Sequence, residues 1–149
     1  MKIPFSPPDI TEQEAQEVTA ALLSGWITTG PRTKQLEKEI AKLCGVDKAV
    51  CLSSATAALE SILQILDIGP GDEVITTAYT YTATASVVCH IGATLRFVDT
   101  QKDSLEMDYD QMAECINERT KAVIPVDLVG IPCNYEKVFA AIESKKHLF

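Results

Sequence analysis

The sequence predicts a doubly wound α/β domain, in which a mainly parallel sheet is covered by helices on both faces. From Lys48 onward, short apolar runs alternate with stretches whose apolar residues recur at helical spacing. Strands separated by single helices require crossover connections, which produce parallel sheets with two covered faces. The chain has 149 residues, of which 46% are hydrophobic, enough for the core of one ordinary domain. We therefore expect a three-layer α/β/α architecture.

Two helices are expected before this alternation begins, within an amino-terminal segment over residues 1–47. The capping-box pattern from Thr11 to Glu14 predicts where the first helix begins, and Gly25 predicts its end. The second helix follows a loop rich in hydroxyl groups and is expected to end at Gly45.

The remaining residues, 48–149, are expected to form the first part of the α/β domain. Apolar runs predict buried strands, and helical spacing predicts the helices between them. The expected strands cover residues 49–52, 95–98 and 122–126, with a further strand that starts at residues 74–75, and the expected helices cover 57–66, 80–90, 110–116 and 135–147. The last two residues, Leu148 and Phe149, are typical of the opening of a further strand. The sequence is therefore expected to be truncated within an unfinished sheet.

Composition excludes several classes of function. The formal net charge is −8 and no dense Lys/Arg cluster is present, which argues against a nucleic-acid partner. No apolar run approaches the roughly 20 residues that a membrane span needs. The cysteines are odd in number, widely spaced and without a CxxC pair, so they predict free thiols, no metal site and a cytoplasmic location: Cys44, Cys51, Cys89, Cys115 and Cys133.

Candidate site residues follow the predicted strands, because ligands of open parallel sheets lie beyond the carboxyl ends of the strands. The turn over residues 53–58 is small and rich in hydroxyls, and it leads into a helix whose free N–H groups suit a phosphate, although plain helix capping is the alternative. Tyr79 and Tyr81 offer aromatic faces to a flat ring, or simply pack. Asp99 and Asp127 each follow a predicted strand, where an aspartate either faces a ligand site or caps the turn.

An ordered set of motifs covers essentially the whole chain. It comprises Ser24 to Pro31 (SGWITTGP), Ser53 to Leu59 (SSATAAL), Ile68 to Ile75 (IGPGDEVI), Thr80 to Ala85 (TYTATA), Gly92-Ala93, Phe97 to Asp99 (FVD) and Thr120 to Val126 (TKAVIPV). Together they resemble the DegT/DnrJ/EryC1/StrS family of sugar-nucleotide aminotransferases. The resemblance implies a fold like the large domain of aspartate-aminotransferase-type (fold type I) enzymes.

The resemblance also implies a function and a set of site residues. Family members use pyridoxal 5'-phosphate (PLP) to transfer an amino group from glutamate to a keto sugar nucleotide in amino sugar biosynthesis, and they form homodimers. By position, Ala55 and Thr56 resemble the residues that hold the cofactor phosphate, and Tyr81 resembles the aromatic residue on the pyridine ring. The run Thr28, Thr29 and Gly30 matches a loop on the substrate side of the pocket.

The family's lysine that forms a Schiff base with the cofactor, and the aspartate that pairs with its ring nitrogen, are expected beyond Phe149. The chain alone is therefore expected to be inactive. Two alternatives stay open: a PLP-dependent sugar dehydratase of the same family, in which histidine replaces that lysine, and a non-catalytic folded remnant. Three residues depart from the family pattern: Thr77 and Leu95 replace prolines, and Asp127 replaces a histidine.

Overall fold

A computed structural model describes residues 7–145 of the chain. Its contacts divide the chain into two compact units, the first ending at Cys51 and the second beginning at Leu52. We call them the helical unit and the α/β unit, and each is described by itself. Neither contains, within the described residues, a helix that is both long and apolar enough to span a membrane.

The helical unit contains two helices, α1 (Glu12–Leu23) and α2 (Pro31–Cys44). The predicted capping box is present, because the Thr11 hydroxyl accepts from the Gln13 N–H at 3.2 Å and the Glu14 carboxylate accepts from the Thr11 N–H at 2.6 Å. The second helix ends at Gly45, whose φ of 65° is left-handed and suits glycine. Both predicted helices of this segment are thus confirmed.

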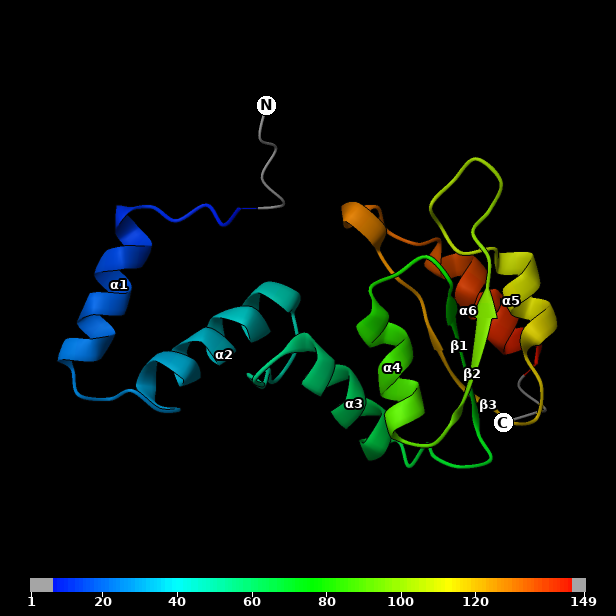
Figure 1. Ribbon diagram of the computed structural model, residues 1–149, viewed down its shortest axis with the longest axis horizontal. Helices are drawn as coiled ribbons and strands as arrows, with labels where there is room; N and C mark the ends of the chain where they lie inside the picture. Colours follow the sequence, from blue (N-terminus) through cyan, green and yellow to red (C-terminus); the bar gives the residue numbers. More distant parts are fainter. Residues whose placement is uncertain (1–6, 146–149) are drawn as a thin grey trace. The chain divides into compact units, whose positions relative to one another are not determined.

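The α/β unit is built on three parallel strands in the order β2-β1-β3. Figure 1 shows the strands with helices on either side. Every residue of the central strand is buried. In chain order its elements are α3 (Ala55–Ile65), β1 (Glu73–Thr77), α4 (Thr82–His90), β2 (Thr94–Val98), α5 (Tyr109–Cys115), β3 (Thr120–Ile124), the short 3-10 helix η1 (Leu128–Gly130) and α6 (Tyr135–Ser144).

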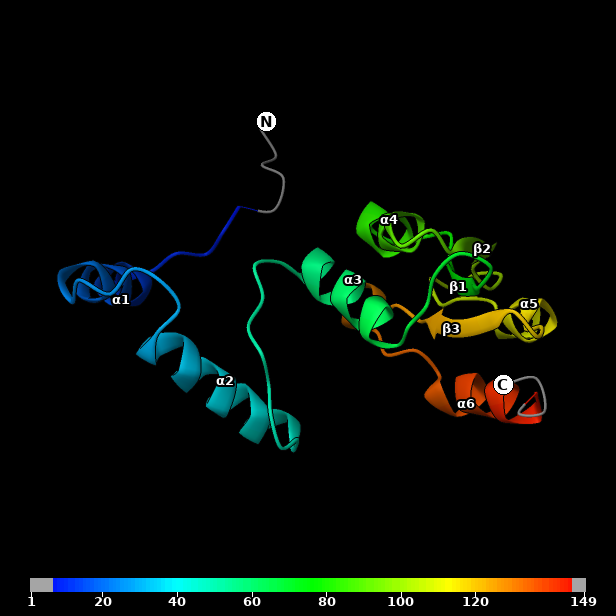
Figure 2. The ribbon, with the colours of Figure 1, turned by 90° about the horizontal axis from the view of Figure 1, so that it is seen from below.

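Two hydrophobic clusters fill the space on the two faces of the sheet. Adjacent residues of β1 point to opposite faces, as the strand period requires. Val74 packs in a cluster with residues of α3 and α4, and Ile75 packs in a cluster with residues of α5 and α6. Figure 2 shows α4 and α6 on opposite sides of the strands. The three-layer α/β/α architecture expected from the sequence is therefore confirmed.

The expected strand over residues 49–52 is wrong. The structure has no regular element there, and Val50 is 74% exposed. A strand needs a partner that satisfies its N–H and C=O groups. Within residues 7–145, the hydrogen bond found for this stretch runs from the Cys51 N–H to the Glu37 side chain at 2.9 Å. An apolar run predicts burial but cannot supply the neighbouring strand.

The last predicted strand is present but shifted toward the amino terminus. Expected over residues 122–126, it is β3 and ends at Ile124. Pro125 follows, and proline has no N–H to donate to a strand ladder. The end of the expected last helix, at residues 146–147, and the strand opening at Leu148 and Phe149 lie outside the described residues.

Candidate cofactor and substrate site

The first turn of α3 presents free backbone donors. Ser54 caps the helix, since its hydroxyl accepts from the Ala57 N–H at 3.1 Å and its carbonyl accepts from the Ala58 N–H at 3.1 Å. The N–H groups of Ala55 and Thr56 precede these bonds and make no hydrogen bond within the described chain. Ala55 is exposed. Free N–H groups and the helix dipole together make this turn suitable for an anionic group such as a phosphate.

Tyr81 lies at the residue before α4, and its side chain is 82% exposed. Two contacts order the loop that leads to it from β1: the Ala78 N–H donates to the Val98 carbonyl at 2.8 Å, and the Tyr79 N–H donates to the Thr77 hydroxyl at 3.3 Å. In Figure 1 both α3 and α4 begin toward the end of the sheet at which β1 finishes. An exposed ring therefore lies at the carboxyl end of the sheet, the same end as the α3 turn.

The run Thr28, Thr29 and Gly30 belongs to the helical unit, in the loop between α1 and α2. Thr28 and Gly30 line a pocket of about 260 Å³ together with Trp26 and neighbouring residues of the same unit. The Thr29 carbonyl accepts from the Trp26 indole N–H at 3.1 Å. The predicted substrate-side loop thus has a hollow of its own, whereas Ala55, Thr56 and Tyr81 lie in the α/β unit.

Asp127 serves the turn that follows β3. Its carboxylate accepts from the Cys133 N–H at 2.9 Å and from the Tyr135 hydroxyl at 3.0 Å. The Cys133 hydrogen bond, and to a lesser degree that of Tyr135, lowers the pKa of the Asp127 carboxyl below its ordinary value. The sequence leaves open whether Asp127 faces the pocket or stabilises its turn. In the structure its carboxylate stabilises the turn.

Asp99 also serves a turn. Its carboxylate accepts from the Thr100 N–H at 2.8 Å, and its carbonyl accepts from the Asp108 N–H at 2.8 Å. These bonds close the loop between β2 and α5, so this aspartate too has a structural use.

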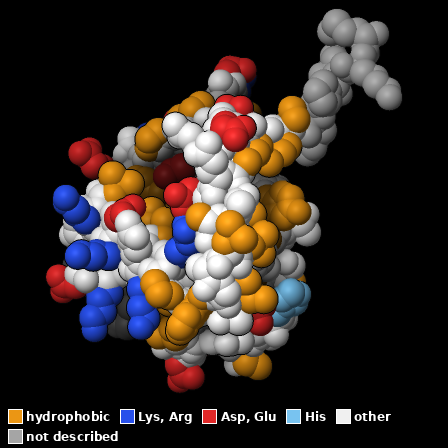
Figure 3. Space-filling view, turned by 90° about the vertical axis from the view of Figure 1, so that its left-hand side faces the viewer, with side chains coloured by type: hydrophobic (Ala, Val, Ile, Leu, Met, Phe, Trp, Pro, Cys, Tyr) orange, Lys and Arg blue, Asp and Glu red, His pale blue; other side chains and the backbone are white. Residues whose placement is uncertain are grey.

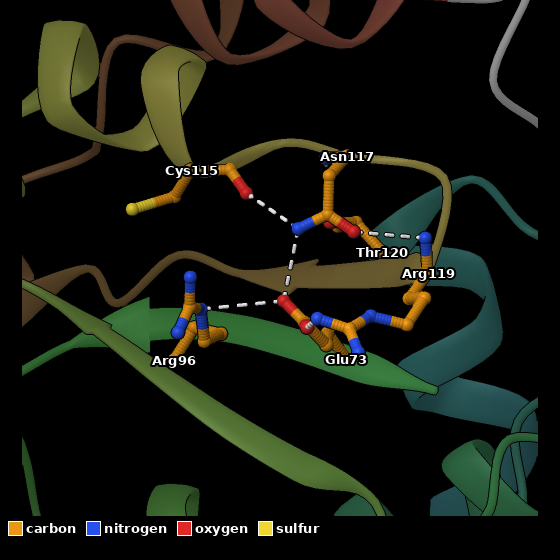
Figure 4. Close-up of polar contacts among 6 residues, drawn as sticks. All are labelled: Glu73, Arg96, Cys115, Asn117, Arg119 and Thr120. Carbon is orange, nitrogen blue, oxygen red and sulfur yellow. Dashed lines mark hydrogen bonds and ion pairs between the residues drawn. The ribbon is translucent and has the colours of Figure 1, made fainter. Parts of the chain in front are cut away.

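A cluster of charged side chains around a buried carboxylate, at the opposite end of the sheet, has no counterpart in the sequence predictions. Glu73 begins β1, and its carboxylate contacts Arg96 Nε at 3.2 Å and Arg119 Nη2 at 2.5 Å. The Asn117 amide donates to the same carboxylate at 3.0 Å (Figure 4). The register that pairs Glu73 with Thr94 and Thr120 brings these side chains together. A glutamate at the start of an apolar strand was the available signal.

Two lysines of the α/β unit, Lys121 and Lys137, are both distant from the α3 turn in the sequence. Lys121 is exposed on β3, and the Lys137 ammonium lies 5.5 Å from the centroid of the Tyr109 ring, a cation–π contact. Within the part of the chain that is described, no group of three or more His, Cys, Asp or Glu side chains could hold a metal ion.

Solved structures of PLP-dependent enzymes with the type I fold resemble the chain closely. The PMP form of Spr1654 of Streptococcus pneumoniae, which is named as a sugar aminotransferase, is 56% identical with a TM-score of 0.95, covering 100% of this chain and 38% of that one. The aminotransferase of Psychrobacter cryohalolentis is 37% identical with a TM-score of 0.87, covering 95% and 36%.

Residues 8–149 match the DegT/DnrJ/EryC1/StrS aminotransferase family, and the chain belongs to that family. The spore coat polysaccharide biosynthesis protein SpsC of Bacillus subtilis (strain 168) is 42% identical over 142 residues, which are 95% of this chain and 36% of that protein. A GDP-4-keto-6-deoxymannose-3-dehydratase is 27% identical with a TM-score of 0.87, covering 95% and 38%. The chain thus spans little more than a third of the length of these relatives.

Proposed function

We propose that this chain is the amino-terminal portion of a PLP-dependent aminotransferase that transfers an amino group from glutamate to a keto sugar nucleotide. The observation that carries the proposal is the α3 turn, with its free N–H groups, in a chain that belongs to a family of sugar aminotransferases. The names of its relatives support the substrate class, because they refer to sugar aminotransfer and polysaccharide biosynthesis.

The residues present fit the cofactor. The N–H groups of Ala55 and Thr56 would bind the phosphate, since they lie at an exposed helix amino terminus with no other acceptor among the described residues. Tyr81 would cover one face of the pyridine ring with its exposed aromatic side chain. When bound, the cofactor supplies an electron sink for the charge left on the amino acid when its α-proton departs. The chain's own residues contribute binding and orientation.

The anchoring lysine and the aspartate for the ring nitrogen are proposed to lie outside these 149 residues. Two findings support this. The relatives are almost three times as long, and in the α/β unit Lys121 is exposed on β3 while Lys137 lies against the Tyr109 ring. We expect the 149-residue chain to bind PLP without transferring an amino group. Borohydride reduction followed by mass spectrometry tests whether a lysine of this chain forms a Schiff base with the cofactor. A specific reduced adduct on one lysine would overturn the proposal that the anchoring lysine lies elsewhere.

The whole protein is proposed to be a homodimer located in the cytoplasm. Exposed apolar side chains support an interface, because burying them against a second chain would be favourable. Figure 3 shows such side chains spread between charged ones over the face in view. Those at least three-quarters exposed include Leu23, Ile27, Leu43, Ile65, Tyr81 and Val129.

A sugar dehydratase is the second candidate, favoured by the 27% identity to the GDP-4-keto-6-deoxymannose-3-dehydratase. The two reactions differ in the fate of the nitrogen. An aminotransferase moves nitrogen-15 from labelled glutamate into the sugar nucleotide, whereas a dehydratase releases it and removes a hydroxyl group from the sugar. Mass spectrometry of the product made by the protein at its natural length separates them. Absence of both products would overturn the assignment to this chemistry.

A further inference from the structure

The indole of Trp26 is held in one orientation by its own loop. Its Nε1–H donates to the Thr29 carbonyl at 3.1 Å. A Cβ added to Gly30 would lie 2.0 Å from Nε1 and 2.4 Å from Cδ1 of the indole, so only glycine lets the ring lie against the backbone there. The Trp26 N–H donates to the Ser24 hydroxyl at 3.2 Å, which fixes the preceding turn. The indole is nonetheless 57% exposed.

This ordered indole forms a wall of the pocket in the helical unit. The pocket has a volume of about 260 Å³ and is lined by Ser24, Trp26, Thr28, Gly30, Pro31 and Arg32. Pockets that enclose a drug-sized ligand measure roughly 300–1,000 Å³. The hollow therefore accommodates one ring of a larger molecule rather than the whole molecule.

The polar groups around the indole suit a hydroxylated ring that carries an anionic group. The Thr28 hydroxyl makes no hydrogen bond within the described part of the chain, so it is available to a ligand. Arg32 forms an ion pair with Glu17 through one of its nitrogens, which orients the guanidinium while other N–H donors remain. One aromatic face, one free hydroxyl and one oriented cation therefore meet at the pocket.

We infer that Trp26 is the stacking wall for the sugar ring of the substrate, a specificity-determining residue that Gly30 and the Thr29 carbonyl hold in place. The C–H face of a pyranose ring is apolar and slightly positive, and it complements the negative face of an indole. The inference rests on the proposed function for its substrate class. A nucleobase would stack on the same surface, so the test separates the two rings of a sugar nucleotide.

Trp26 is the one tryptophan of the sequence, so its fluorescence reports on the pocket directly. We expect UDP-N-acetylglucosamine or GDP-mannose to change the emission of the purified protein. Calorimetry then gives dissociation constants for each sugar nucleotide and for UDP or GDP alone. Trp26→Leu is expected to raise the dissociation constant for the sugar nucleotide about two- to tenfold and to leave that for the nucleotide unchanged. Trp26→Phe, which keeps a ring, is expected to give a smaller loss.

Two further variants control the experiment. Gly30→Ala should displace the indole, shifting its emission in the free protein and weakening sugar-nucleotide binding although the tryptophan remains. Ile27→Ala alters an exposed neighbour outside the pocket, and it should change neither the indole emission nor sugar-nucleotide binding. Failure of both sugar nucleotides to bind, or an equal loss of nucleotide affinity in Trp26→Leu, overturns the inference. Neither result touches PLP binding in the α/β unit, on which the proposed function depends.

Discussion

The Glu73 carboxylate lies 2.5 Å from Arg119 Nη2, with the carboxylate side chain 2% exposed and the arginine side chain 68% exposed. The contact joins the start of β1 to the residue before β3, and Arg96 adds β2 to the same anion. A buried carboxylate is costly unless cations and hydrogen bonds satisfy it, and here two guanidiniums and the Asn117 amide do so. The cluster therefore fixes the register at the amino ends of all three strands.

Removing the charge of Glu73 should destabilise the α/β unit. Glu73→Gln keeps the side-chain shape but turns an amide toward two arginines, so we expect the free energy of unfolding to fall by about 1–3 kcal/mol. Urea denaturation measures the change. The matched variant Glu118→Gln removes an exposed carboxylate in the same region and should stay within about 0.5 kcal/mol of the wild type. Equal effects of the two substitutions would refute the role of the cluster.

Truncating two apolar residues should separate the real core from the stretch that only looks like a strand. Ile75 is completely buried in β1, so Ile75→Ala is expected to cost about 2–5 kcal/mol. Val50 is exposed outside any strand, so Val50→Ala should change stability by less than about 0.5 kcal/mol. A large loss in Val50→Ala would show that residues 49–52 are buried in solution.

The Asp127 turn predicts a pH dependence of stability. Its carboxyl pKa is lower in the folded chain than its ordinary value, because the Cys133 N–H and the Tyr135 hydroxyl donate to the charged form. A lowered folded pKa contributes stability that is present above the unfolded pKa and is lost as the pH falls through the folded pKa. Asp127→Asn should therefore lower the melting temperature at pH 7 and lower it less near pH 3. An unchanged difference between the two pH values would contradict this.

Tyr81 should contribute to cofactor affinity through its ring and not through its hydroxyl. Tyr81→Ala is expected to raise the dissociation constant for PLP about two- to tenfold, the magnitude of one aromatic contact. Tyr81→Phe should leave it unchanged, because among the described residues the hydroxyl of Tyr81 has no hydrogen-bond partner. Titration followed by PLP absorbance measures both. A loss in Tyr81→Phe equal to that in Tyr81→Ala would assign the contact to the hydroxyl.

Local signals in the sequence predicted much of the fold. The capping box at Thr11 and the left-handed Gly45 act over a few residues, so they can be read directly from the sequence. The alternation of apolar runs and helical spacing predicted the layers, because the helices cover both faces of the buried central strand with their apolar residues. For the candidate site, the start of α3 was predictable from its small and hydroxyl-bearing residues, but the strand expected before it is absent from the described part of the chain.

Features that depend on distant partners were not predictable in this way. Residues 49–52 have the composition of a strand but no paired neighbour among the described residues, so composition misled. The Glu73 cluster unites residues more than twenty positions apart, through a register that only the folded sheet defines. The fit of Gly30 against the Trp26 indole is likewise a matter of three-dimensional packing.

The cofactor cradle at the first turn of α3 is the central claim, and a comparison of PLP with pyridoxal tests it most directly. Pyridoxal has the same ring without the phosphate. We expect the wild-type chain to bind PLP more tightly than pyridoxal, and Ala55→Asp to abolish that preference by placing a negative charge at the free N–H groups. Gln13→Asp, which adds the same charge to the first turn of α1, should keep it. Equal binding of PLP and pyridoxal by the wild type, or an undiminished preference in Ala55→Asp, would contradict the claim.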